Sequence, residues 1–254
     1  MIIMSKNKSG NMMENLKLYK DVYTRKELQV DRKMVNECLD NYSVFSLDEN
    51  SIVMDLGMNI GAFGHMCKNA GVKNYIGVEP DDSNFNIASM NVDGIENLIL
   101  YKGVATISKD EELTFYQSDS KNSKCAGTVV STGNIARRKN GEKYSVKNYN
   151  VYDLIDKHRP THLKVDIEGA EVEWLKDCDG KFHECIQELS FEVHAKRGIE
   201  TYIEFYDKIA EDFDHVSITP NTGFPGSGII KYEKLGIDVD ARIWGVDIFL
   251  KRKS

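Results

Sequence analysis

The sequence predicts an α/β protein whose chain forms one doubly wound, mostly parallel, seven-stranded sheet with helices on both faces. From about residue 50 onward, short apolar runs alternate with amphipathic stretches. Parallel neighbouring strands need a long crossover connection, so this alternation indicates βαβ units. The 254 residues suit one such domain, and a composition of 41% hydrophobic and 29% charged residues is typical of globular proteins.

Seven apolar runs are the candidate strands. They are residues 51–56, 75–78, 98–101, 162–167, 186–193, 216–219 and 243–250. Helical spacing of apolar residues is found between several of them, in residues 62–70, 83–91, 170–178 and 200–213. This order is Rossmann-like, because each helix returns the chain to the end of the sheet at which the next parallel strand begins.

Two regions depart from this alternation. Residues 1–45 are expected to be an N-terminal helical extension packed on the core, since apolar residues recur at near-helical spacing from Arg25 to Tyr42. Residues 46–254 form the main domain. Within it, residues 111–150 break the pattern and are rich in Ser, Asn, Gly and Lys. We expect this insertion to face the substrate, because ligands bind where the carboxyl ends of central strands open.

Charge and cysteine content narrow the class of protein. The net charge of −7 disfavours a surface that holds long nucleic acid, so no nucleic-acid partner is expected. Five cysteines without a C-x-x-C pair fit neither a disulfide framework nor a zinc knuckle. No apolar stretch is long enough for a signal peptide or a membrane span. We therefore expect a cytoplasmic protein.

The segment Asp55-Leu56-Gly57-Met58-Asn59-Ile60-Gly61 predicts a ligand-binding loop between a buried strand and a helix. A second acid, Glu79, ends the next strand about twenty residues later, at the spacing at which a carboxylate meets a ribose diol. The G-x-x-x-G-x-x-G spacing differs from the dinucleotide pattern, and the Asp55 carboxylate would repel a diphosphate but attract a sulfonium group. These features favour S-adenosylmethionine, with an NAD-dependent oxidoreductase as the alternative.

A second group of charged residues lies on the segment Leu163-Lys164-Val165-Asp166-Ile167-Glu168-Gly169. Charged residues at alternate positions of a central strand are costly to bury without partners, so they call for a site. Asp166, at the carboxyl end of the strand, is well placed to take a proton from an acceptor hydroxyl. Lys164 and Glu168 either take part in the chemistry or form an internal ion pair.

The following strand adds two more candidates, Glu192 and His194, which alternation places on one side. His194 has a pKa suited to a base near neutrality. Asp166, Glu168 and Glu192 could instead hold Mg²⁺ or Mn²⁺, which would lower the pKa of the acceptor hydroxyl.

The loop from Val53 to Gly61, the triplet Val78-Glu79-Pro80 and above all the string from His162 to Glu171 resemble FkbM-type methyltransferases. The resemblance extends from about residue 50 to the end. It implies a class I methyltransferase fold, S-adenosylmethionine as donor, and O-methylation of a hydroxyl on a sugar, a glycan or another glycosylated small molecule. A nucleic-acid methyltransferase is a further alternative. With the loop described above, the expected cofactor contacts are Asp55, Gly57, Asn59, Gly61, Glu79, Pro80, Ala105 and Asp166, and the expected catalytic residues are Asp166, His194, Glu192 and Lys164.

Overall fold

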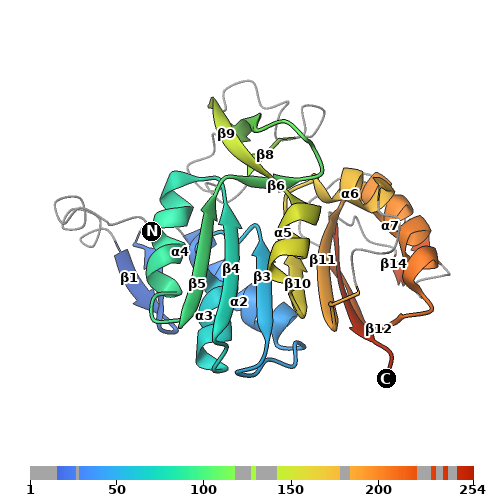
Figure 1. Ribbon diagram of the computed structural model, residues 1–254, viewed down its shortest axis with the longest axis horizontal. Coiled ribbons are helices and arrows are strands. Elements are labelled where there is room, and N and C mark those ends of the chain that lie inside the picture. The colour runs from blue at the N-terminus through green and yellow to red at the C-terminus, as the bar shows by residue number, and fades with distance from the viewer. Residues whose placement is uncertain are drawn as a thin grey trace.

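The computed structural model describes residues 16–26, 29–117, 127–129, 142–177, 184–221, 230–232, 237–239 and 245–254. Its main sheet consists of β3 (Ile52–Leu56), β4 (Asn74–Glu79), β5 (Asn97–Lys102), β10 (His162–Val165), β11 (Glu188–His194), β12 (Phe213–Asn221) and β15 (Gly245–Arg252). The spatial order is β12-β15-β11-β10-β3-β4-β5 (Figure 1). Only β15 runs antiparallel to its neighbours in this sheet. The predicted α/β, mostly parallel seven-stranded fold is therefore confirmed.

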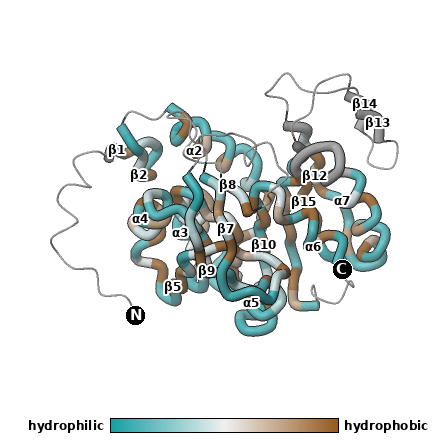
Figure 2. The backbone as a smooth tube through the Cα atoms, turned by 90° about the horizontal axis from the view of Figure 1, so that it is seen from above, coloured by the Kyte–Doolittle hydropathy of each residue, from teal (hydrophilic) through white to brown (hydrophobic). Residues whose placement is uncertain are grey.

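Helices cover both faces of this sheet. One face carries α5 (Val151–His158), α6 (Glu171–Asp177) and α7 (Ala195–Ile209), and the other carries α2 (Gln29–Tyr42), α3 (Ala62–Asn69) and α4 (Asp82–Asn91). Leu189 and Phe191 of β11 are fully buried under α6 and α7, whereas Val53 of β3 is buried under α2 and α3. In Figure 2, brown hydrophobic stretches gather on the central strands and teal ones on the outer helices. Burial on both faces explains why these strands are almost continuously apolar.

The N-terminal extension contains a hairpin in addition to the predicted helix. Strands β1 (Leu16–Tyr19) and β2 (Val22–Arg25) pair antiparallel across Lys20 and Asp21. Both turn residues have positive φ, 48° and 64°, as a tight two-residue hairpin turn requires. The usual turn signal, Asn or Asp followed by Gly, is missing at this position, so the sequence did not predict the hairpin.

The described part of the insertion forms a second, smaller sheet together with residues 104–106, which precede it. Its strands are β6 (Val104–Thr106), β9 (Lys143–Asn150), β7 (Glu112–Gln117) and β8 (Gly127–Thr128), in that spatial order. Val104, Phe115 and Val146 give this sheet a small core of its own. Figure 1 shows it above the edge of the main sheet at which the parallel strands end. The insertion thus lies beside the expected ligand-binding edge.

Helix α5 has no counterpart among the predicted helices. The Asn150 side chain caps it by accepting hydrogen bonds from the backbone N–H groups of Tyr152 (2.9 Å) and Asp153 (3.3 Å). An Asn cap followed by an acid in the first turn is a helix-start signal. The alternating pattern of residues 144–151 hides this signal, because it predicts a strand up to the same point.

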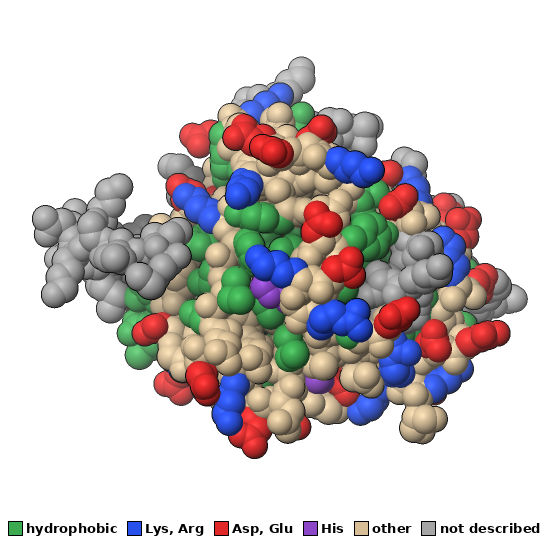
Figure 3. All heavy atoms as spheres, viewed as in Figure 1, with side chains coloured by type: hydrophobic (Ala, Val, Ile, Leu, Met, Phe, Trp, Pro, Cys, Tyr) green, Lys and Arg blue, Asp and Glu red, His purple; other side chains and the backbone are tan. Residues whose placement is uncertain are grey.

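The remaining elements are peripheral. Strands β13 (Ile230–Tyr232) and β14 (Ile237–Val239) form a separate antiparallel pair. Within the described ranges, no helix combines the length and apolar character that crossing a membrane requires. On the face seen in Figure 3, acidic and basic side chains are interspersed.

Candidate cofactor and acceptor site

The loop after β3 passes directly beneath the end of β10. Gly57 has φ +84°, and a Cβ at this position would lie 1.8 Å from the carbonyl oxygen of Asp166. The N–H groups of Gly57 and Met58 both donate to the carbonyl of Val78 at 3.0 Å, and the Asp166 N–H donates to that of Leu56 at 3.0 Å. The loop is therefore fixed between two strands, and only glycine fits at position 57.

The second half of the loop is anchored to α4. Asn59 also has positive φ, 52°, and its side-chain oxygen accepts a hydrogen bond from the Ile60 N–H at 2.8 Å. Gly61, with φ +76°, lies so close to α4 that a Cβ would come within 2.8 Å of the Ala88 Cα. Gly61 therefore allows close packing of loop and helix.

A pocket opens between this loop, the carboxyl end of β4, strand β6 and the turn after β10. Of the predicted cofactor residues, Gly57, Asn59, Glu79, Pro80, Ala105 and Asp166 line it. Asp55 and Gly61 are not part of its lining. The turn residue Glu168 and the insertion residues Phe115 and Thr128 complete its walls.

Glu79 is a buried acid of this pocket with a perturbed pKa. It is 6% exposed, and its carboxylate accepts hydrogen bonds from the backbone N–H groups of Asn59 (3.0 Å) and Asp81 (2.9 Å). Burial raises its pKa to about 7 against the effect of these bonds, and the Asp81 carboxylate adds to the increase. The charged form of a buried carboxylate is stabilised by further hydroxyl donors, which a ribose diol would supply.

A polar wall that was not predicted from the sequence lies next to Glu79. Asp81 is the N-cap of α4, where its side chain accepts a hydrogen bond from the Asn84 N–H at 2.9 Å. Gln117 of β7 donates its side-chain N–H to the other oxygen of Asp81. The Asp81-x-x-Asn84 cap was visible in the sequence. The contact with Gln117 was not, because it joins the insertion to the main domain.

Asp55 lies beneath the loop rather than in the pocket. It is fully buried and accepts hydrogen bonds from the Tyr75 hydroxyl at 2.6 Å and from Lys164 Nζ at 3.0 Å. Its charge is thus paired inside the protein. The predicted attraction of Asp55 for a sulfonium group would have to act across the Gly57 backbone.

Lys164 is the cation of this buried cluster. Besides Asp55, it donates to the Gly57 carbonyl at 3.0 Å, and its ammonium lies 3.7 Å from the Asp166 carboxylate. Burial lowers the pKa of Lys164, but the carboxylates of Asp55 and Asp166 more than offset this effect and hold it above its usual value. Lys164 therefore stays protonated and orients the loop and Asp166. Its ion pairs are with these two acids and not with Glu168.

The strand conformation ends at Val165, one residue before Asp166. Glu168 has φ +53° and Gly169 φ +102°, and the Gly169 N–H donates to the Glu171 carboxylate at 2.7 Å. Strand alternation therefore does not extend to Glu168. Among the described residues, no group of three or more His, Cys, Asp or Glu side chains is placed to hold a metal ion. The expected set of Asp166, Glu168 and Glu192 is not assembled as a metal site.

The acids of the next strands lie beside Asp166. The pairing of Val165 with Phe191 places Glu192 next to Asp166, and Glu192 lies directly opposite Asp247 of β15. His194 ends β11, but its side chain lies outside the described part of the structure. The strand register thus points to neighbouring positions for Asp166 and Glu192, and the roles of these two residues and of His194 stay predictions.

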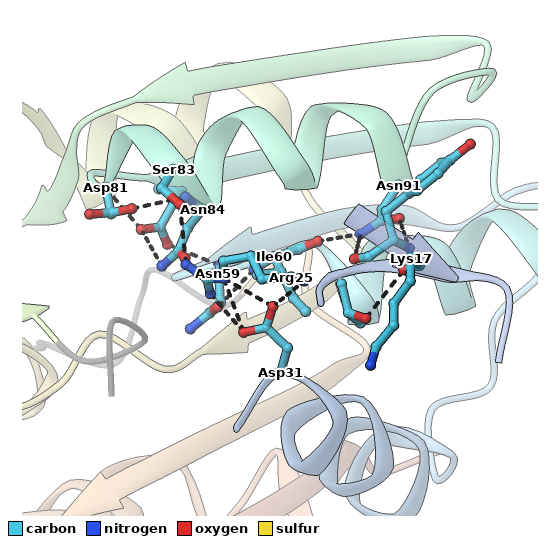
Figure 4. A network of polar contacts seen from close by, with 12 residues as sticks. Lys17, Arg25, Asp31, Asn59, Ile60, Asp81, Ser83, Asn84 and Asn91 are labelled. Carbon is cyan, nitrogen blue, oxygen red and sulfur yellow. Dashed lines mark hydrogen bonds and ion pairs between the residues drawn. The ribbon is translucent and has the colours of Figure 1, made fainter. Parts of the chain in front are cut away.

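A polar network ties the N-terminal extension to the cofactor loop (Figure 4). The Asn91 side-chain amide donates to the carbonyls of Ile60 (2.7 Å) and Tyr23 (3.1 Å), and its oxygen accepts from the Tyr23 N–H at 2.7 Å. A single side chain at the end of α4 therefore joins the loop to β2.

A buried ion pair supports the other end of α4. Asp31 of α2 is fully buried and accepts hydrogen bonds from Arg25 at its backbone N–H (2.8 Å) and at Nη2 (2.7 Å). Arg25 Nη1 reaches the Ser83 hydroxyl at 3.2 Å, one residue before Asn84 of the pocket (Figure 4). The extension is therefore structurally continuous with the cofactor side of the pocket.

One family model and several solved structures match this chain. The family model described as "Methyltransferase FkbM domain" matches residues 55–217. No curated protein sequence matches the chain. Similar solved structures include TYW2 of M. jannaschii in complex with AdoMet, at 12% identity over 94% of this chain and 86% of that chain, with a TM-score of 0.46. Another is the precorrin-6y C5,15-methyltransferase of Geobacter metallireducens GS-15, at 10% identity over 92% and 96% of the two chains, also with a TM-score of 0.46. Because the family match covers more than half of its length, this chain belongs to the FkbM methyltransferase domain family and is a methyltransferase.

Proposed function

We propose that this protein transfers a methyl group to a hydroxyl of a sugar or of another glycosylated small molecule, with Asp166 as the group that takes the hydroxyl proton. The observation that carries the proposal is the position of Asp166. Its backbone packs against Gly57 of the cofactor loop, while its side chain is 23% exposed and lines the pocket. One residue thus lies next to both the donor loop and the open space.

The pocket residues fit the donor. The glycine at position 57 lets the backbone approach a ligand closely, and the buried Glu79 carboxylate suits a ribose diol. Bound S-adenosylmethionine would supply an electrophilic methyl group on its sulfonium. Asp166 would accept a hydrogen bond from the acceptor hydroxyl and take its proton as the oxygen–carbon bond forms. Lys164 would hold the Asp166 carboxylate in place from 3.7 Å away.

The charge of the pocket supports an acceptor without phosphate groups. Glu79, Asp81, Asp166 and Glu168 all line it. Carboxylates repel a phosphate at short range but accept hydrogen bonds from neutral hydroxyls. The same charge favours a sugar over a nucleic acid as the acceptor.

The experiment compares Asp166→Asn with the matched control Asp153→Asn, which removes an exposed carboxylate on α5. Transfer of radiolabelled methyl from S-adenosylmethionine to a panel of neutral sugars is measured, together with the affinity for S-adenosylhomocysteine. We expect Asp166→Asn to lower kcat by about a hundredfold to ten-thousandfold, because a proton acceptor is lost, with cofactor affinity changed less than about twofold. Wild-type turnover in Asp166→Asn would refute its role. Transfer to RNA but to no sugar would refute the acceptor class.

A further inference from the structure

Three carboxylates form a row across the main sheet at its carboxyl edge. Asp166 follows β10, Glu192 lies beside it on β11, and Asp247 lies opposite Glu192 on β15. Residues that pair between neighbouring strands share a face of the sheet. Lys164 and Asp55, which pair between β10 and β3, lie on the same face as these carboxylates. Helix α2 covers this face. We call Asp166, Glu192 and Asp247 the carboxylate row.

Helix α2 ends directly over the carboxylate row. Asn41 Nδ2 donates to Asp247 Oδ2 at 3.0 Å, and Lys164 Nζ lies 5.4 Å from the ring centroid of Tyr42. The rings of Phe45 and Phe63 pack against Tyr42, with centroid distances of 6.3 and 5.2 Å. These contacts fix the position of the Tyr42 ring.

The Tyr42 hydroxyl makes no hydrogen bond with any described residue, although Tyr42 is only 6% exposed. By comparison, the buried hydroxyls of Tyr75 and Tyr202 are bonded, to Asp55 at 2.6 Å and to His215 at 2.8 Å. The Tyr42 hydroxyl is not among the fully enclosed side-chain atoms that lack a partner in the described structure, so it is open to a hydrogen-bond acceptor on a ligand. Burial raises the pKa of Tyr42 well above its usual value, and the negative charges of the carboxylate row add a smaller increase. The side chain is therefore a neutral hydrogen-bond donor.

We propose that Tyr42 binds the methyl acceptor, donating its hydroxyl proton in a hydrogen bond to an acceptor oxygen beside the carboxylate row, and that this site selects uncharged polyhydroxy compounds. The carboxylate row accepts hydrogen bonds from hydroxyl groups and repels phosphate and carboxylate groups. This inference rests on the proposed hydroxyl methylation. It adds that part of the acceptor site comes from α2, which lies before the matched residues 55–217.

The first test is Tyr42→Phe, which removes only the hydroxyl. The probes are glucose, rhamnose and N-acetylglucosamine, with glucose 6-phosphate as the charged counterpart of glucose, and Tyr202→Phe is the control for loss of a buried tyrosine hydroxyl. We expect kcat/KM for the methylated neutral sugar to fall about tenfold to a hundredfold, because one buried hydrogen bond is lost. Affinity for S-adenosylhomocysteine should change less than about twofold, and Tyr202→Phe should keep its kcat/KM. An unchanged kcat/KM in Tyr42→Phe, or faster methylation of glucose 6-phosphate than of glucose, would overturn the inference.

A second test needs no acceptor. The variant Tyr42→Cys, shown to bind S-adenosylhomocysteine, reacts with a cationic and an anionic methanethiosulfonate, and mass spectrometry follows the peptide that carries residue 42. Each rate is divided by that reagent's rate with free cysteine. We expect the cationic reagent to react about tenfold faster, because the carboxylate row attracts it. No modification, or equal rates, would overturn the position assigned to Tyr42. A clear cation preference in an enzyme that methylates no sugar would refute the proposed acceptor class while supporting the place of Tyr42 in the site.

Discussion

Replacing Glu79 with glutamine tests whether this buried acid binds the ribose of the donor. Burial raises the pKa of Glu79 to about 7 in the free protein. Two hydroxyl donors from a ribose would stabilise its charged form, so its pKa should fall when the cofactor binds. Binding then releases a proton near neutrality, and the affinity must rise with pH up to the free pKa.

The size of the effect follows from the ionised fraction. A carboxyl with a pKa of about 7 is about 90% ionised at pH 8 and about 10% at pH 6, so affinity for S-adenosylhomocysteine should be about tenfold lower at pH 6. In Glu79→Gln the affinity should be independent of pH and, at pH 8, about tenfold to a hundredfold weaker than in wild type, since charge-assisted hydrogen bonds are lost. Titration calorimetry in buffers of different ionisation enthalpy measures both the affinity and the released proton.

The stability of the cofactor-free protein should change in the opposite direction. Because the folded pKa of Glu79 lies above the ordinary value of 4.5, the folded state binds more protons than the unfolded state between these values. The free energy of unfolding therefore falls as pH rises from 4.5 to about 7, by about 3 kcal/mol from this group. Urea unfolding should find Glu79→Gln more stable than wild type at pH 8. Asp82→Asn is the matched control, because Asp82 lies close by in the chain at the start of α4 and its side chain is 73% exposed. A flat pH dependence in wild type, or full cofactor affinity in Glu79→Gln, would refute the reasoning.

Two further substitutions test the contacts that hold the cofactor loop in place. Gly57→Ala should abolish cofactor binding, because its Cβ would lie 1.8 Å from the Asp166 carbonyl, whereas Gly71→Ala, at a similar φ of +85° with nothing within 4 Å, should cost only about 1–2 kcal/mol of stability. Equal effects of the two, seen by urea unfolding and calorimetry, would mean that backbone strain and not the close approach matters at position 57. Asn91→Ala should weaken binding of S-adenosylhomocysteine about tenfold, since the loop carbonyl of Ile60 loses its donor, while Asn97→Ala, which breaks an exposed contact with Asn74, should leave binding unchanged. Unaltered affinity in Asn91→Ala would show that the loop does not depend on the network of Figure 4.

Local patterns in the sequence were sufficient for the strands of the main sheet, most helices and the loop. Each of these features depends on residues close together in the chain: apolar runs for the strands, and a strand, glycines and a helix for the loop. Alternation along the two strands also predicted that Asp166 and Glu192 point the same way, because parallel strands end at one edge of the sheet. The family resemblance is confirmed over residues 55–217, and the expectation of S-adenosylmethionine as donor came from it.

The partners of the charged residues were decided only by the tertiary structure. Lys164 pairs with Asp55, which is 109 positions earlier, because the register of β10 on β3 places them side by side. The turn at Glu168 removes that residue from the same face, which no strand pattern could show. Tyr42 reaches the carboxylate row because α2 packs over β10 and β15, and Gln117 reaches Asp81 because the insertion folds back onto α4. These contacts join segments far apart in the chain, and a single sequence carries no local signal for them.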